Sequence, residues 1–166
     1  MITVGCVAHG LSLFFKDVAD ARKCPWISKL VTAALLLSNT VGSSERIRAA
    51  LHREQTRITG GVKGITVHAP TRFAVQLFIV SDLLDSKDSL LALCHSEHWE
   101  EASSGSSNAD SFRDAVLMNR PYSQLWFNFL LYVELMQPFS DAIHQLEADK
   151  PMLSQVRYFR GSWYHS

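Results

Sequence analysis

Several features that define specialised classes of protein are scarce in this sequence. Its 166 residues include three cysteines, an odd number that argues against a disulfide framework and favours the nucleus or the cytosol. Lysine plus arginine and aspartate plus glutamate number 16 each, so any binding to nucleic acid must come from a local patch. No apolar run reaches the roughly 20 residues of a membrane-spanning helix. The first residues lack the basic head of a targeting peptide, and no membrane contact is expected.

The most prominent feature of the sequence is the helical spacing of its apolar residues. Apolar side chains make up 47% of the chain and charged ones 19%, which suits one globular domain with a real core. Apolar positions recur at intervals of three and four, which predicts a mainly α fold. We expect helices over residues 7–18, 25–41, 45–59, 71–84, 87–94, 112–116 and 125–136, with a further helical stretch through Ile143 and Leu146.

Turn residues and caps predict where these helices begin and end. Pro25 suits a first helical turn, and Ser43 and Ser44 suit the N-cap of the next helix. Gly42 and Gly60 are expected to end their helices. At the start of the chain, residues 1–5 are β-branched and closed by a glycine, which predicts a short strand.

The second half of the chain is predicted to hold a polar loop and a central helix. The serine-rich stretch 102–110 suits a mobile surface loop. The segment 119–121 is expected to open a helix that is apolar nearly all round over 125–136, and therefore buried on several sides. Pro138 is expected to kink or end it.

One basic stripe stands out. Arg46, Arg53 and Arg57 recur at i, i+7 and i+11 of a predicted helix and line one of its faces. They lie shortly before Arg72 and Phe73, and arginines beside an exposed aromatic are what phosphate binding plus base stacking require. The alternative is a solvated charged face with Phe73 in the core, and for Phe73 the periodicity favours core packing.

A second candidate is the pair Cys6 and His9. Thiolate and imidazole are preferred zinc ligands, but a structural site needs four, and the candidates for the remainder are Cys94, His95 and His98. A nucleophilic trio with Asp17 is disfavoured, because side chains on one straight helix point outward in parallel rather than converging. We expect a buried cysteine packed beside a histidine, with neither a metal site nor a catalytic site.

Three segments resemble the transposases of the hAT superfamily, the hobo, Activator and Tam3 group, in the same order and with similar spacing. They are "GCVAHGLSLFFKDVA", "APTRFAVQLFIVSDLLDSKDSLLALCHSEHWEE" and "LMQPFSDAIHQLEADKPML". In that family a Cys-x-x-His segment follows a strand of an RNase H-like core, and a Thr-Arg-Trp-like motif opens a helix of an inserted all-α domain. The resemblance therefore implies a core fragment over 1–22 and an insertion domain over 23–166, truncated at its C-terminal end.

The resemblance also implies roles for single residues. Cys6 and His9 match the Cys-x-x-His motif, and Thr71 and Arg72 match the Thr-Arg dipeptide, which implies positions close to transposon-end DNA. Phe73 stands where the family usually has tryptophan, which is implicated in stacking on a displaced base. Phenylalanine keeps the π-face and loses the indole donor.

The family's chemistry uses three acidic residues that hold a divalent metal such as magnesium. By motif order, two of them are expected upstream of residue 1 and the third beyond residue 166, so no catalytic residue and no cofactor is assigned to this chain.

The expected function is that of a fragment or degenerate relative of a hAT-type transposase, located in the nucleus. It would retain at most contact with hairpin or single-stranded DNA. Its other partners would be the remainder of the transposase chain or a second copy. The alternative is a non-catalytic helical protein-interaction module, or the remnant of a transposable element.

Overall fold

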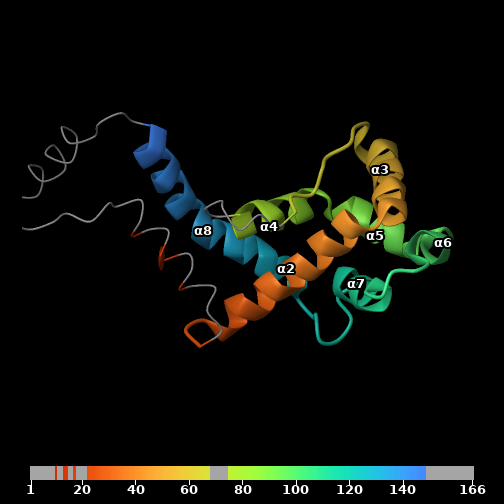
Figure 1. Ribbon diagram of the computed structural model, residues 1–166, viewed down its shortest axis with the longest axis horizontal. Coiled ribbons are helices and arrows are strands. Elements are labelled where there is room, and N and C mark those ends of the chain that lie inside the picture. The colour runs from red at the N-terminus through yellow and green to blue at the C-terminus, as the bar shows by residue number, and fades with distance from the viewer. Residues whose placement is uncertain (1–9, 11–12, 15–16, 18–21, 68–74, 149–166) are drawn as a thin grey trace, which may run out of the picture.

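The computed structural model describes residues 10, 13–14, 17, 22–67 and 75–148, and this part of the chain is built from helices packed on one another (Figure 1). No strand occurs among the described residues, so the mainly α fold class is confirmed. The strand expected at 1–5 lies outside them, and the RNase H-like core remains a prediction. The helices are α2 (Pro25–Ser43), α3 (Glu45–Thr59), α4 (Val75–Asp85), α5 (Lys87–His95), α6 (Trp99–Ser103), α7 (Ala109–Val116) and α8 (Leu125–Ala148).

The helix α2 organises the packing. It contacts α3, α4, α7 and α8, while α4 also packs along α8 and α3 packs against α5 (Figure 1). Its buried side carries Leu30, Ala34 and Leu37 at helical spacing. Among the fully buried side chains, the largest are Phe112 of α7 and Phe129 and Tyr132 of α8. Burial of these aromatic and aliphatic groups is the main favourable term in the stability of the fold.

Local signals set most of the predicted ends of α2 and α3. Pro25 lies in the first turn of α2, and the Ile47 amide donates to Ser44 Oγ over 3.3 Å, so Ser44 is the N-cap of α3. Gly60 follows α3 with a φ of 75°, the left-handed conformation that glycine adopts at low cost. The prediction that Gly42 ends α2 is wrong by one residue. A Cβ at that position would lie 2.9 Å from Val67 Cγ2, so this glycine permits a close approach.

Two predictions in the second half of the chain differ from the structure. The loop expected over 102–110 is confirmed for residues 104–108, but its two ends are helical: Ala102 lies in α6, and Ala109 begins α7. Burial explains the short helix α6, because Trp99 is 3% exposed and stacks on Phe112 with ring centroids 5.5 Å apart. The segment 119–121 does not open α8, which begins at Leu125.

The helix α8 continues through Pro138 to Ala148. The helical stretch expected through Ile143 and Leu146 is therefore confirmed, as part of the same helix, while the expectation that Pro138 ends the helix is wrong. The prediction that α8 is buried on several sides is also wrong, because it is buried on one side only. The side chains of Trp126, Phe129, Tyr132 and Met136 are buried, whereas those of Phe127, Leu130, Leu131 and Leu135 are 43–63% exposed. None of the helices in the described part is long and apolar enough to cross a membrane.

Candidate nucleic-acid interface

The three predicted arginines of α3 share one exposed face. We call Arg46, Arg53 and Arg57 the arginine face; all three are exposed, at positions i, i+7 and i+11 of a continuous helix. Steps of seven and eleven residues return to nearly the same direction around a helix axis. The structure therefore brings these three predicted residues together.

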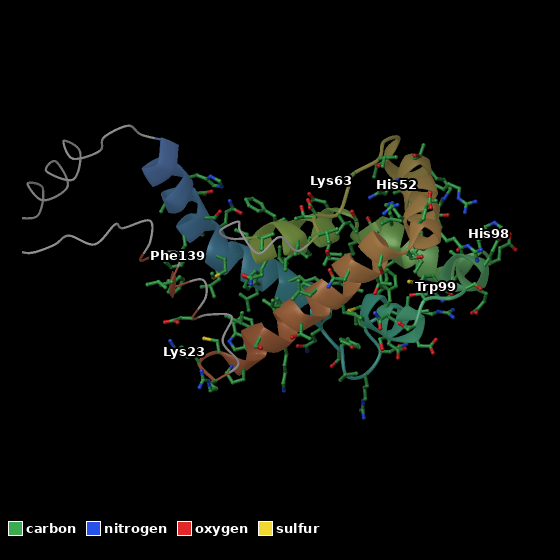
Figure 2. All side chains as sticks on the ribbon, viewed as in Figure 1. Lys23, His52, Lys63, His98, Trp99 and Phe139 are labelled. Atoms are coloured by element: carbon green, nitrogen blue, oxygen red, sulfur yellow. The ribbon has the colours of Figure 1, made fainter. Side chains whose placement is uncertain are left out.

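A shallow hollow of about 410 Å³ lies on the outer surface of α3. His52, Arg53, Thr56 and Arg57 line it, and Figure 2 shows His52 on α3. The hollow places two guanidinium groups and an imidazole along one helix surface, with no carboxylate among its lining residues. Guanidinium groups offer paired donors with the geometry that phosphate oxygens accept.

Ion pairing divides the arginine face into two kinds of residue. Arg57 approaches Glu54 Oε2 through Nη2 at 2.8 Å and Nε at 2.9 Å, so its charge is partly compensated. Arg46 and Arg53 form no ion pair with any described residue. These two remain available to an anionic partner.

The opposite side of α3 fixes this face in the fold. Ile47, Ala50 and Leu51 are buried, and α3 packs on α2, α5 and α6. Gln55, only 3% exposed, donates from Nε2 to Lys63 O (2.9 Å) and Ser86 Oγ (3.2 Å), and its Oε1 accepts from the Lys63 amide (3.3 Å). The helix that carries the arginines is thus held in the fold by its buried apolar side chains and by the hydrogen bonds of Gln55.

Ion pairs connect the segment after α3 to α4. Lys63, labelled in Figure 2, pairs with Asp85 and lies 3.6 Å from Asp82 Oδ1. The Asp85 carboxylate raises the pKa of Lys63, so this lysine stays charged. The backbone amide and hydroxyl of Thr66 both donate to Asp82 Oδ2, at 2.9 and 2.6 Å. Lys63 is therefore occupied within the fold.

The remaining predicted site residues lie outside the described part of the chain. They are Cys6, His9, Thr71, Arg72 and Phe73. Their distance from the arginine face stays untested, and so does the choice between stacking and core packing for Phe73. Asp17, once considered beside Cys6 and His9, pairs with Lys23 at 2.7 Å.

The candidate remainder of a zinc site does not converge. Cys94 is fully buried, and this burial raises the pKa of its thiol to about 12, which disfavours the thiolate that a metal needs. His95 Nδ1 lies 2.8 Å from Leu91 O, and His98 is exposed beside Glu97. Within the described residues, no three His, Cys, Asp or Glu side chains gather as a metal site would require.

Sequence reasoning missed a second hollow in the described part. It measures about 920 Å³ and is lined by residues of α2, of the segment 117–124 and of the first turn of α8, with Ser111 of α7. Trp26 and Lys29 of α2 and Tyr122 of the segment 117–124 are among its lining residues. The spacing of Trp26, Lys29 and Ala33 marks one face of α2, but the sequence carries no signal that residue 122 lines the same hollow.

Searches with the sequence and the fold give no match: no family model, no curated protein and no solved structure matches this chain.

Proposed function

We propose that this chain is a fragment or degenerate relative of a hAT-type DNA transposase, and that its remaining activity is contact with DNA through the arginine face. The proposal combines the resemblance of three segments to that superfamily with the electrostatics of α3. The three acidic residues of the family's metal site match no motif of this chain, so we propose no catalysis for the chain by itself.

One observation carries the proposal: Arg46 and Arg53 are exposed, aligned and without an ion-pair partner in the described part. Ordinary surface arginines are often compensated by neighbouring carboxylates, as Arg57 is by Glu54. The helix α3 contains four arginines and only two glutamates. Two uncompensated guanidinium groups on a rigid helix suit two phosphates of a nucleic-acid backbone.

A titration with labelled hairpin and single-stranded DNA at several salt concentrations tests this proposal. The double variant Arg46→Ala/Arg53→Ala should weaken binding and reduce the slope of log affinity against log salt by about 1.4 for a single strand, about 0.7 per lost phosphate contact. The control Lys23→Ala/Arg48→Ala removes the same charge away from the arginine face and should change the slope far less. Equal effects of the two pairs would leave only nonspecific attraction and refute the proposed face.

The exposed side of α8 supports a second candidate function, a protein-interaction module. Phe127, Leu131 and Leu135 recur every four residues and are 63%, 43% and 48% exposed. Large contiguous apolar surfaces on soluble proteins mark interaction sites. The occupant that this ridge fits is a second copy in antiparallel orientation: with Leu131 at the two-fold axis, Phe127 meets Leu135 and Glu134 meets the Asn128 carboxamide. Ridges spaced by four residues pack in this way between helices.

The oligomeric state tests this second candidate. Sedimentation of the purified chain should show a dimer that Leu131→Lys dissociates, while Gln137→Lys, which changes an exposed position off the ridge, should not. Under mild oxidation, Leu131→Cys should crosslink to its own copy, because only a residue near the two-fold axis meets itself. A monomer at all concentrations, with no crosslink, rules it out.

A further inference from the structure

The hollow beside α2 shares no lining residue with the hollow on α3. Its volume of about 920 Å³ is more than twice that of the hollow on α3. Part of its lining belongs to α2, and the rest comes from Ser111 of α7, from the segment between α7 and α8, which we call the loop wall, and from the start of α8. Figure 1 shows where these elements lie. We call this hollow the α2 groove; its lining residues are Trp26, Ser28, Lys29, Leu30, Thr32, Ala33, Leu36, Ser111, Pro121, Tyr122, Ser123, Leu125 and Asn128.

The lining of the groove contains two aromatic rings and one charged residue, which is positive. Trp26 is 45% exposed although tryptophan is a residue that folding usually covers, and Tyr122 belongs to the loop wall. Lys29 is the one charged residue in the lining, and no carboxylate accompanies it. The groove is therefore complementary to a ligand that is planar or apolar and carries negative charge.

Polar side chains in the lining are free to recognise a ligand. The hydroxyls of Ser111 and Ser123 and the carboxamide of Asn128 form no hydrogen bond with the described part of the chain, whereas the Thr32 hydroxyl donates to Ser28 O at 2.8 Å. Together the three free groups offer donors and acceptors of the kind that bond the edges of nucleobases.

The loop wall is held in an unusual conformation. Met118 and Gln124, which bracket the residues Pro121 to Ser123, have φ values of 57° and 68°, in the left-handed region that L side chains adopt at a cost. Neighbouring bonds secure this wall: the Tyr122 amide donates to Asn119 O (2.7 Å), and Trp126 Nε1 donates to Val116 O (2.9 Å). Non-glycine residues keep such angles where the surrounding structure fixes them, and they occur often at ligand sites. The position of Tyr122 is thus set before any ligand arrives.

We propose that the α2 groove binds a nucleobase of single-stranded nucleic acid, which stacks on Trp26 while Lys29 pairs with the adjoining phosphate. This inference rests on the proposed function and extends it, since the arginine face supplies phosphate contacts and the α2 groove supplies contacts to the bases. Aromatic stacking accepts any base and adds affinity that does not depend on salt. An apolar peptide helix fits less well, because it would leave the three free polar groups and Lys29 without partners.

Single-stranded oligonucleotides with and without bases test the inference. The probes are a fluorescently labelled oligo(dT) of about 12 nucleotides and an abasic strand with the same phosphates. Binding is measured by anisotropy at three salt concentrations for the wild type, Trp26→Ala, Trp26→Phe and the control Phe78→Ala. Phe78 is the matched control because it is an exposed aromatic, at 39%, outside the groove and outside the ridge of α8. All four proteins should melt at similar temperatures, since both positions are partly exposed.

The expected result is that the wild type binds oligo(dT) about tenfold more tightly than the abasic strand, the size of one base stack. Trp26→Ala should lose that preference with an unchanged salt slope, Trp26→Phe should keep part of it, and Phe78→Ala should keep all of it.

Three other outcomes overturn the inference. If the wild type binds but Trp26→Ala and Phe78→Ala bind oligo(dT) as it does, the α2 groove is no base site and the arginine face stands alone. If the wild type binds neither strand at low salt, the proposed function fails and the inference with it. If Trp26→Ala alone loses binding of an acidic amphipathic helical peptide while its oligo(dT) affinity is unchanged, the groove is assigned to a protein partner.

Discussion

Replacing Gln55 by alanine should destabilise the fold without touching the arginine face. The Gln55 side chain is 3% exposed and points away from the arginines of the same helix. Its carboxamide holds both backbone polar groups of Lys63 and the hydroxyl of Ser86. The variant therefore separates the stability of α3 from its charge.

The loss of stability depends on whether water can replace Gln55 as the hydrogen-bond partner of Lys63 and Ser86. Lys63 is exposed, so water can replace its two backbone hydrogen bonds, at a cost of about 0.5 kcal/mol each. Ser86 is 1% exposed and loses its bond in a buried place, which costs about 1–2 kcal/mol. We expect the free energy of unfolding to fall by about 2–3 kcal/mol.

Urea unfolding followed by tryptophan fluorescence measures this change, because Trp99 and Trp126 are buried reporters. A double-mutant cycle with Ser86→Ala should give a coupling of about 1 kcal/mol. The control Gln137→Ala removes an exposed bond to Asp141 and should cost at most about 0.5 kcal/mol. A Gln55→Ala variant as stable as this control, or strictly additive effects of Gln55→Ala and Ser86→Ala, would refute the reasoning.

Two further predictions concern pH and the end of α3. Burial raises the pKa of Cys94 from 9.0 to about 12 and that of Tyr132 from 10.0 to about 12. Between the ordinary and the raised pKa of each group, the unfolded chain loses a proton that the folded chain keeps. The free energy of unfolding should therefore be unaffected by these groups below pH 9, and above the ordinary pKa of each group it should fall by about 1.4 kcal/mol per pH unit. Cys94→Ala should flatten the part of that decline that begins at pH 9 in urea titrations, and an unchanged curve would contradict it. Gly60→Ala should lower the free energy of unfolding by about 1 kcal/mol because φ is 75°, although a Cβ there would meet no other atom. The control is Gly61→Ala, since Gly61 lies in open space without a positive φ. Thermal melting compares the two variants, and equal melting temperatures would contradict the prediction.

Helix existence and the arginine face were predictable because both depend on neighbours in the chain. Ser44 caps α3 through a bond to a residue three positions later, and Pro25 fits a first turn with its fixed φ. The alignment of Arg46, Arg53 and Arg57 needs nothing more than the helical repeat of 3.6 residues. That these residues contact DNA is a separate prediction, which rests on the resemblance and awaits the titration.

The errors lie where distant contacts override local preference. Serine and glycine predicted a loop over 102–110, but its two ends belong to α6 and α7, whose buried rings Trp99 and Phe112 stack on each other. The apolar content of α8 predicted burial all round, yet Phe127 and Leu131 face outward because α2 and α4 cover only the other sides of the helix. Composition counts apolar side chains, but it does not say how many neighbours the fold supplies to cover them.

By itself, therefore, the sequence determined a mainly α chain, the caps of α3 and the line of arginines along it, since hydrogen bonds and side-chain directions within one helix depend on residues a few positions apart. Only the tertiary structure decided which side of α8 stays open, and that Trp26 and Tyr122 line the same groove. These features depend on contacts between segments far apart in the chain, and their formation is governed by the packing of the whole core.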